Sequence, residues 1–174
     1  MARANYLATQ FGPNEERWPT PTAMYARTPE KGKFVVREIE LLVPLSEKTS
    51  VPIMWEGWDI AHKRELALEL FGEMRRGEIC DGLVLISWKH ENIPKLARQM
   101  GCGPAEGCPE RYPGTTFDQV WNIRYTYDQS EHKERKKGAM LPPHWSIQGT
   151  VLQENFDPVA WKKVGGQVDI GGEY

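Results

Sequence analysis

The 174-residue sequence lacks the marks of a membrane-spanning or disulfide-rich secreted protein. No apolar run approaches the roughly 18 residues that cross a bilayer, and the N-terminal residues lack the apolar core of a secretory signal. The three cysteines, Cys80, Cys102 and Cys108, are too few for a disulfide framework. We therefore expect an intracellular protein, cytoplasmic or organellar, with no membrane span.

An excess of charge of one sign is also absent. Lysine and arginine total 22 against 24 for aspartate and glutamate, which gives a net charge of −2 and no global attraction to nucleic acid or acidic lipid. The one basic run, residues 132–137, lies among turn-like residues. We interpret it as a solvated loop rather than a binding patch, and expect no nucleic-acid partner.

Residues that bind metals are sparse. A structural zinc site needs four ligands, usually in two closely spaced pairs, and no second pair accompanies Cys102 and Cys108. We expect these two to be free loop cysteines, with a local disulfide or a metal clip as the alternatives. The sequence predicts no metal site and no other cofactor.

Helical and strand-like segments alternate along the chain. Helical patterns cover residues 1–10, 37–48, 59–76 and 92–101, and strand patterns cover 23–26, 51–54, 83–87, 117–127 and 147–152. This alternation predicts a doubly wound, mostly parallel α/β sheet with helices on both faces. We expect one α/β domain over residues 1–141, and an extended C-terminal segment over 142–174 that packs on the domain or on a partner.

Several boundaries of these elements have local signals. The run Leu83–Ser87 is apolar without alternation, as in a central parallel strand covered on both faces. Asp59 is a good N-cap for the helix that ends before Gly77. Asn92 is placed to cap the next helix, which Gly101 closes.

His90 lies three residues after the run Leu83–Ser87 and two before Asn92. Ligands of open parallel sheets gather beyond the carboxyl ends of the strands, and a helix N-terminus offers unpaired N–H groups to an anion. His90 is therefore a candidate phosphate ligand. The alternative is a histidine that caps the turn or bonds a backbone carbonyl.

The segment around His90 resembles a known family. Leu85–Ala97, with the sequence LISWKHENIPKLA, is similar to the second-histidine motif of the histidine phosphatase superfamily, which has the phosphoglycerate-mutase-like fold. Lys89 stands where one branch of that superfamily has an acidic residue. Phe117–Ile123 is similar to the strand that follows in that branch. The resemblance implies an α/β fold of this type.

Two upstream segments extend the resemblance to roughly residues 2–127. Arg37–Glu40 resembles a segment Arg-Pro-Ile-Glu-Thr whose arginine binds phosphate, with Glu38 in place of the proline and Leu41 in place of the threonine. Ala2–Ala8 resembles the helix that follows the family's catalytic loop. Because the chain opens with this helix, the sequence predicts a missing first strand, and a sheet edge that a protein partner or a second copy covers.

The resemblance also implies a site. Arg3, Arg37 and His90 would bind a phosphate or a phosphomonoester, and Glu56 would be the acid that protonates the leaving oxygen. The alternative for Glu56 is a solvated loop carboxylate, and capping is the favoured role of Asp59. His90, Arg37 and Glu56 would be vestigial catalytic residues if the nucleophile is absent.

In that superfamily the nucleophile is a histidine within Arg-His-Gly. None of the four histidines of this chain, His62, His90, His132 and His144, lies in such a motif. The favoured hypothesis is a histidine-phosphatase-like protein that is non-catalytic, a structural or phosphate-binding subunit of a larger assembly. The alternative is a phosphomonoesterase whose N-terminal catalytic segment is missing from this sequence.

Overall fold

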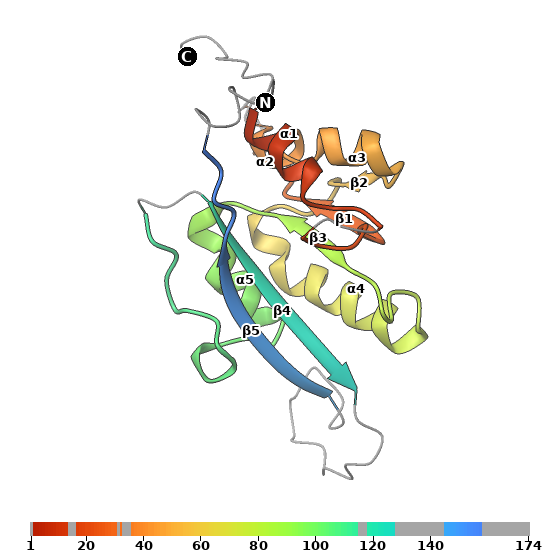
Figure 1. The fold of residues 1–174 in the computed structure, drawn as a ribbon. Helices are drawn as coiled ribbons and strands as arrows, with labels where there is room; N and C mark the ends of the chain where they lie inside the picture. The colour runs from red at the N-terminus through yellow and green to blue at the C-terminus, as the bar shows by residue number, and fades with distance from the viewer. Residues whose placement is uncertain are drawn as a thin grey trace. The chain divides into compact units, whose positions relative to one another are not determined.

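A computed structural model describes residues 2–13, 17–30, 32, 36–114, 118–127 and 145–157 (Figure 1). The chain divides into two compact units. The first unit comprises Met1–Ile60, Ile79–Lys89 and Asn155–Tyr174, and the second comprises Ala61–Glu78 and His90–Glu154. Each unit combines helices with strands, so the chain is a mixed α/β protein, as expected.

The first unit contains a parallel sheet with helices beside it. Its elements are α1 (Ala2–Thr9), β1 (Ala23–Ala26), α2 (Arg37–Glu40), α3 (Val43–Thr49), β2 (Ile53–Met54) and β3 (Val84–Ser87). The strand order is β2-β1-β3, and both pairings are parallel, with Met24 opposite Ile53 on one side and Leu85 on the other. The expected strands at residues 23–26, 51–54 and 83–87 are confirmed.

The order of the strands corrects one expectation. Among the described residues, β1 lies in the centre of this sheet and is buried along its whole length, whereas β3 pairs with β1 alone and has three half-buried residues. The prediction that Leu83–Ser87 forms the central strand was wrong. An apolar run predicts that the side chains of a strand are covered, but it does not predict whether one or two other strands pair with its backbone.

The core of the first unit joins the sheet to α1 and α3. Lys48 of α3 donates hydrogen bonds to the carbonyls of Ala8, at 3.1 Å, and Phe11, at 2.6 Å, where a cation suits the C-terminal end of α1. The buried core residues are Leu7, Ala8, Phe11, Met24, Ala26, Leu42 and Leu45. The helix expected over residues 37–48 is divided into α2 and α3, because Pro44 belongs to the first turn of a new helix.

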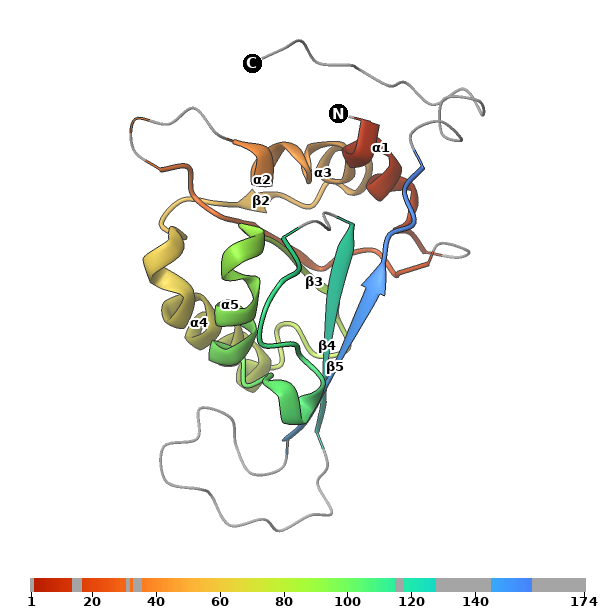
Figure 2. The same ribbon diagram turned by 90° about the vertical axis from the view of Figure 1, so that its left-hand side faces the viewer.

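The second unit pairs two helices with an antiparallel hairpin (Figure 2). It contains the end of η1 (Ile60–His62), α4 (Lys63–Arg76), η2 (His90–Asn92), α5 (Ile93–Gln99), η3 (Pro104–Glu106), β4 (Gln119–Tyr127) and β5 (Trp145–Gln153). The register runs from Gln119 opposite Gln153 to Tyr127 opposite Trp145. The strand expected at 147–152 is confirmed and is longer, so the first part of the predicted C-terminal segment is a sheet strand.

The helix boundaries were predicted in part. His62, and not Asp59, occupies the N-cap position of α4, because the 3₁₀ turn η1 comes between Asp59 and the α-helix. Gly77 ends α4 with a φ of 77°, as expected. Asn92 has the N-cap position of α5 but makes no side-chain capping bond, and Gly101 follows that helix with a φ of 80°.

Cys102 and Cys108 form a disulfide, so the expectation of free loop cysteines was wrong. The turn of η3 brings their Cα atoms to 5.6 Å, within the range that a disulfide requires. Both cysteines are buried and pack against Trp121 and Ile123 of β4 and Ile147 of β5. A disulfide is less common in a reducing compartment, which weakens the argument for an intracellular location from cysteine usage.

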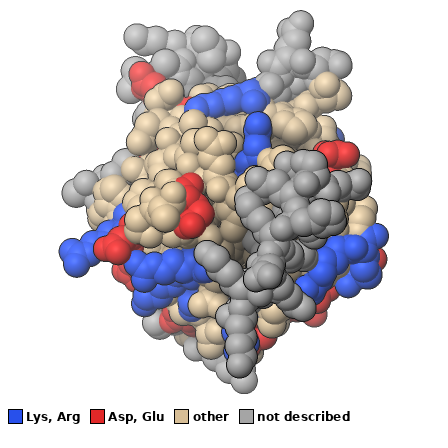
Figure 3. Space-filling model, turned by 90° about the horizontal axis from the view of Figure 1, so that it is seen from below, with Lys and Arg blue, Asp and Glu red and all other residues tan. Residues whose placement is uncertain are grey.

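Several predicted features lie outside the described residues: Phe117, His132, His144, the basic run at 132–137 and the chain after Asp157. None of the described helices is long and apolar enough to cross a membrane. On the face in Figure 3, basic and acidic side chains lie near one another in small groups.

Candidate functional site

The carboxyl ends of the three parallel strands mark the candidate site in the first unit. Because β1, β2 and β3 run in the same direction, the residues that follow them lie along one edge of the sheet. Arg27 follows β1, Trp55 follows β2, and Trp88 follows β3. This is the edge where open parallel sheets take their ligands.

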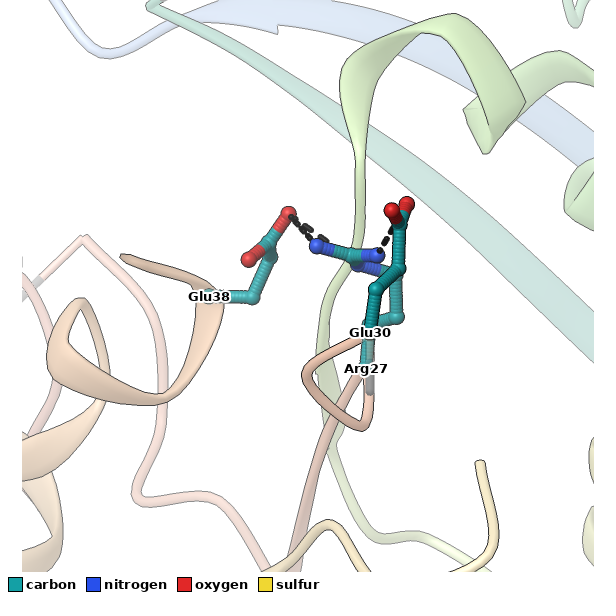
Figure 4. A network of polar contacts seen from close by, with 3 residues as sticks. All are labelled: Arg27, Glu30 and Glu38. Carbon is teal, nitrogen blue, oxygen red and sulfur yellow. Dashed lines mark hydrogen bonds and ion pairs between the residues drawn. The ribbon is translucent and has the colours of Figure 1, made fainter. Parts of the chain in front are cut away.

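Arg27 is the buried charge at this edge, with only 4% of its surface exposed. Its backbone N–H donates to the carbonyl of Ser87 at 3.0 Å, which fixes it beside the end of β3. Its guanidinium lies between two carboxylates (Figure 4). Glu38 Oε1 accepts from Arg27 Nε at 3.2 Å and lies 3.1 Å from Nη2, while Glu30 Oε1 accepts from Nη1 at 3.3 Å. We call these three residues the Arg27 cluster.

The Arg27 cluster is not fully satisfied. Glu38 is 13% exposed, and its second oxygen, Oε2, is buried without a hydrogen-bond partner among the described residues. A buried acceptor without a donor costs about 1–3 kcal/mol. One cation faces two carboxylates, so the cluster carries a formal charge of −1. A change in the position of the Glu38 side chain that gives Oε2 a hydrogen-bond donor would therefore be favourable.

The loop after β2 is fastened to the same edge by Thr28. The Thr28 N–H donates to the Trp58 carbonyl at 2.9 Å, and the Trp58 N–H donates to the Thr28 hydroxyl oxygen at 2.8 Å. The Thr28 hydroxyl in turn donates to the carbonyl of Trp55. Gly57 makes the turn with a φ of 85°, so the exposed Glu56 stands on a loop held to the end of β1.

Three of the residues implied by the family resemblance belong to the first unit. Arg3 is half-buried on α1, Glu56 is exposed on the loop after β2, and Arg37 is exposed as the first residue of α2. Arg37 directly precedes Glu38, and it is Glu38 whose side chain reaches Arg27. The roles of these residues in phosphate binding stay predictions.

His90 belongs to the second unit, where it opens η2 ahead of α5. Its ring lies 5.8 Å from that of Tyr112, and Tyr112 stacks on Trp121 of β4 with ring centroids 6.1 Å apart. His90 is half-buried, and the next residues include the buried Asn92. Arg37 and His90 are in different units, so a phosphate site shared by them stays a prediction.

Sequence reasoning missed Arg27, Glu30 and the side-chain direction of Glu38. One signal was available, because Arg27 immediately follows the strand pattern 23–26 and therefore stands at the carboxyl end of a strand. No group of three or more His, Cys, Asp or Glu residues in the described parts of the chain could hold a metal ion.

Comparison of the chain with protein-family models, with curated protein sequences and with solved structures finds no match.

Proposed function

We propose that this chain is a histidine-phosphatase-like domain that binds phosphate or a phosphomonoester without transferring the phosphoryl group, as a subunit of a larger assembly. The observation that supports it most is Arg27, a buried guanidinium at the carboxyl end of the central parallel strand. Arginine presents a planar fork of N–H donors that matches phosphate oxygens. The resemblance adds Arg3, Arg37 and His90 as proposed ligands.

The proposal assigns binding rather than turnover to this site. Phosphoryl transfer by the family's route needs a nucleophilic histidine, and the sequence has no Arg-His-Gly motif. Glu56, exposed on its loop, is a proposed vestigial acid. Arginines that hold a phosphate but face no nucleophile stabilise the bound anion and leave its ester bond intact.

We also propose a doubly wound, phosphoglycerate-mutase-like sheet, completed at β3 by a strand from a protein partner or a second copy. β3 is an edge strand, and no further strand pairs with it among the residues that the structure describes. An unpaired edge offers a row of N–H and C=O groups to another strand. A doubly wound, phosphoglycerate-mutase-like sheet would follow if a strand from a protein partner or a second copy paired there.

Calorimetric titration of the full chain with inorganic phosphate and with vanadate tests the binding function. We expect saturable binding that weakens in Arg37→Ala and His90→Ala, and weakens most in Arg27→Lys, which keeps the charge but removes the fork of donors. An Arg75→Ala variant is the control, because this exposed cation in the last turn of α4 is 15 residues from His90, the nearest proposed ligand in sequence. Equal binding by all five proteins would contradict the proposal.

A turnover assay with p-nitrophenyl phosphate tests the non-catalytic part of the proposal. We expect no turnover above that of heat-denatured protein. Sustained turnover that disappears in His90→Ala would refute the non-catalytic part. Intact mass and N-terminal sequencing of the protein from its native source test the phosphomonoesterase alternative, which requires an upstream segment with Arg-His-Gly.

A further inference from the structure

We infer that Arg27 is the principal anion-binding residue of the first unit, and that Glu38 is an internal ligand which an incoming phosphate displaces. This inference rests on the proposed function. It adds that Arg27 binds the phosphate and that Glu38 competes with the phosphate for Arg27. It is carried by the geometry of the Arg27 cluster and by the greater exposure of Glu38, 13% against 4% for Arg27.

The contact between Glu38 and Arg27 is a poor match for a guanidinium. Nε and Nη2 form the edge of the group that binds two separate oxygens in a well-made pair. Here the single oxygen Oε1 of Glu38 serves both nitrogens, at 3.2 and 3.1 Å, while Oε2 is buried without a donor. A phosphate would supply one oxygen to each nitrogen and have others left for water or a second cation.

The two partners differ in how firmly the fold holds them. Arg27 follows the buried central strand, and its backbone is bonded to Ser87. Glu38 lies on the short helix α2; Ile39 of this helix packs against the core, whereas the Glu38 side chain is 13% exposed, against 4% for Arg27. Displacement therefore requires only that Glu38 leaves Arg27 for solvent, where both of its oxygens are hydrated.

Displacement of Glu38 removes one negative charge from the Arg27 cluster. With Glu38 in place, one cation faces two carboxylates, and the formal charge is −1. With Glu38 in solvent, the Nε and Nη2 edge of Arg27 is open and the formal charge of the cluster rises to zero. This edge takes two oxygens of one oxyanion, so the ligand class is inorganic phosphate or a terminal phosphomonoester.

Calorimetry with inorganic phosphate and with glycerol phosphate tests the inference on Glu38→Gln, whose amide keeps the size and an acceptor oxygen but removes the charge. We expect the dissociation constant to fall at least about tenfold relative to the wild-type chain. Glu30→Gln is the matched control, because it removes the same charge from the same guanidinium at a different nitrogen, Nη1. We expect it to change the constant by less than about threefold.

The outcomes separate the inference from the proposed function. Phosphate binding that Arg27→Lys weakens but Glu38→Gln leaves unchanged would overturn the inference alone. Equal tightening by Glu30→Gln and Glu38→Gln would also overturn it, because net charge would then be the cause. Absence of binding in both the wild-type chain and Glu38→Gln would overturn the proposed function, and the inference with it. Binding by Glu38→Gln alone would support the inference.

A measurement on the wild-type chain keeps the inference testable if Glu38→Gln fails to fold. The Nε–H proton of Arg27 gives a distinct nitrogen–proton resonance when it is hydrogen-bonded and shielded from solvent. We expect this resonance to shift as phosphate is added and to saturate with the calorimetric constant. A resonance unmoved by saturating phosphate would overturn the inference.

Discussion

Gly149 of β5 is a position where one added methyl group should have a large effect on stability. A Cβ built at this residue would lie 2.6 Å from the sulfur of Cys102, 2.6 Å from that of Cys108 and 3.1 Å from the backbone nitrogen of Cys108. Real Cβ atoms do not approach other atoms so closely, and the two sulfurs are bonded to each other, so they cannot move apart. We therefore predict that Gly149→Ala destabilises the second unit.

The magnitude follows from two opposing effects. Overpacking a well-filled site costs about 1–3 kcal/mol, and a contact with two linked sulfurs and a backbone atom belongs at the upper end. Replacing glycine by alanine inside a strand returns about 0.5–1 kcal/mol. The expected net loss is about 2 kcal/mol in the free energy of unfolding, measured by urea denaturation followed by tryptophan fluorescence. For a chain of this size, 1 kcal/mol corresponds to about 2–4 °C in the melting temperature.

Gly114→Ala is the matched control, because a Cβ there meets nothing within 4 Å. A second control removes the obstacle. In a Cys102→Ala, Cys108→Ala background, which itself should cost about 2 kcal/mol for a loop this short, Gly149→Ala should cost less than half as much as in the native chain. If Gly149→Ala is as stable as Gly114→Ala, or costs the same with and without the disulfide, the contact with the sulfurs is not the cause.

Two other predictions concern buried polar groups. Arg27→Met should lower the unfolding free energy by about 1–3 kcal/mol in urea denaturation, because the hydrogen bonds of the guanidinium are lost while Glu38 turns into solvent. A loss of about 3–5 kcal/mol would show that Glu38 stays buried without its cation. Tyr125→Phe should cost about 1 kcal/mol, because the hydroxyl donates to the Met100 carbonyl at 2.7 Å. Burial raises the pKa of Tyr125 above the value of about 10 that tyrosine has in the unfolded chain. The stability that the buried, neutral phenol contributes is therefore fully present below a pH of about 10 and is lost as the pH rises above it. Stability between pH 9 and 12 should accordingly fall more steeply in the wild-type chain than in Tyr125→Phe, and parallel profiles would count against this burial effect.

The strands could be located from the sequence because their side-chain patterns are local, but their order could not. Ala23–Ala26 contains two alanines and looks a weaker strand than Val84–Ser87, yet it lies in the centre of the sheet. Small side chains suit a strand whose two faces are closely covered. Which strand is central depends on backbone pairing, and no periodicity of side chains records it.

The disulfide shows a similar limit. A spacing of six residues between Cys102 and Cys108 is compatible with free thiols, a metal clip or a bridge. The bridge depends on the turn of η3 and on the bare backbone of Gly149, which leaves room for both sulfurs against β5. That glycine is 41 residues from Cys108, so the feature that makes the bridge fit lies far away in the sequence.

The candidate site depends on a local sequence motif and on a contact that the sequence does not reveal. The segment Arg37–Glu40 predicts a role for Arg37, because an arginine at that position of the family's motif binds phosphate. The structure places the neighbouring Glu38 on Arg27, a residue 11 positions earlier. Where that motif has a proline, this chain therefore has a carboxylate that reaches the end of the central strand. If the proposed function is correct, this carboxylate competes with phosphate for the same guanidinium, and we then expect the dissociation constant for phosphate to depend on Glu38 more than on the exposed Arg37 or Glu56.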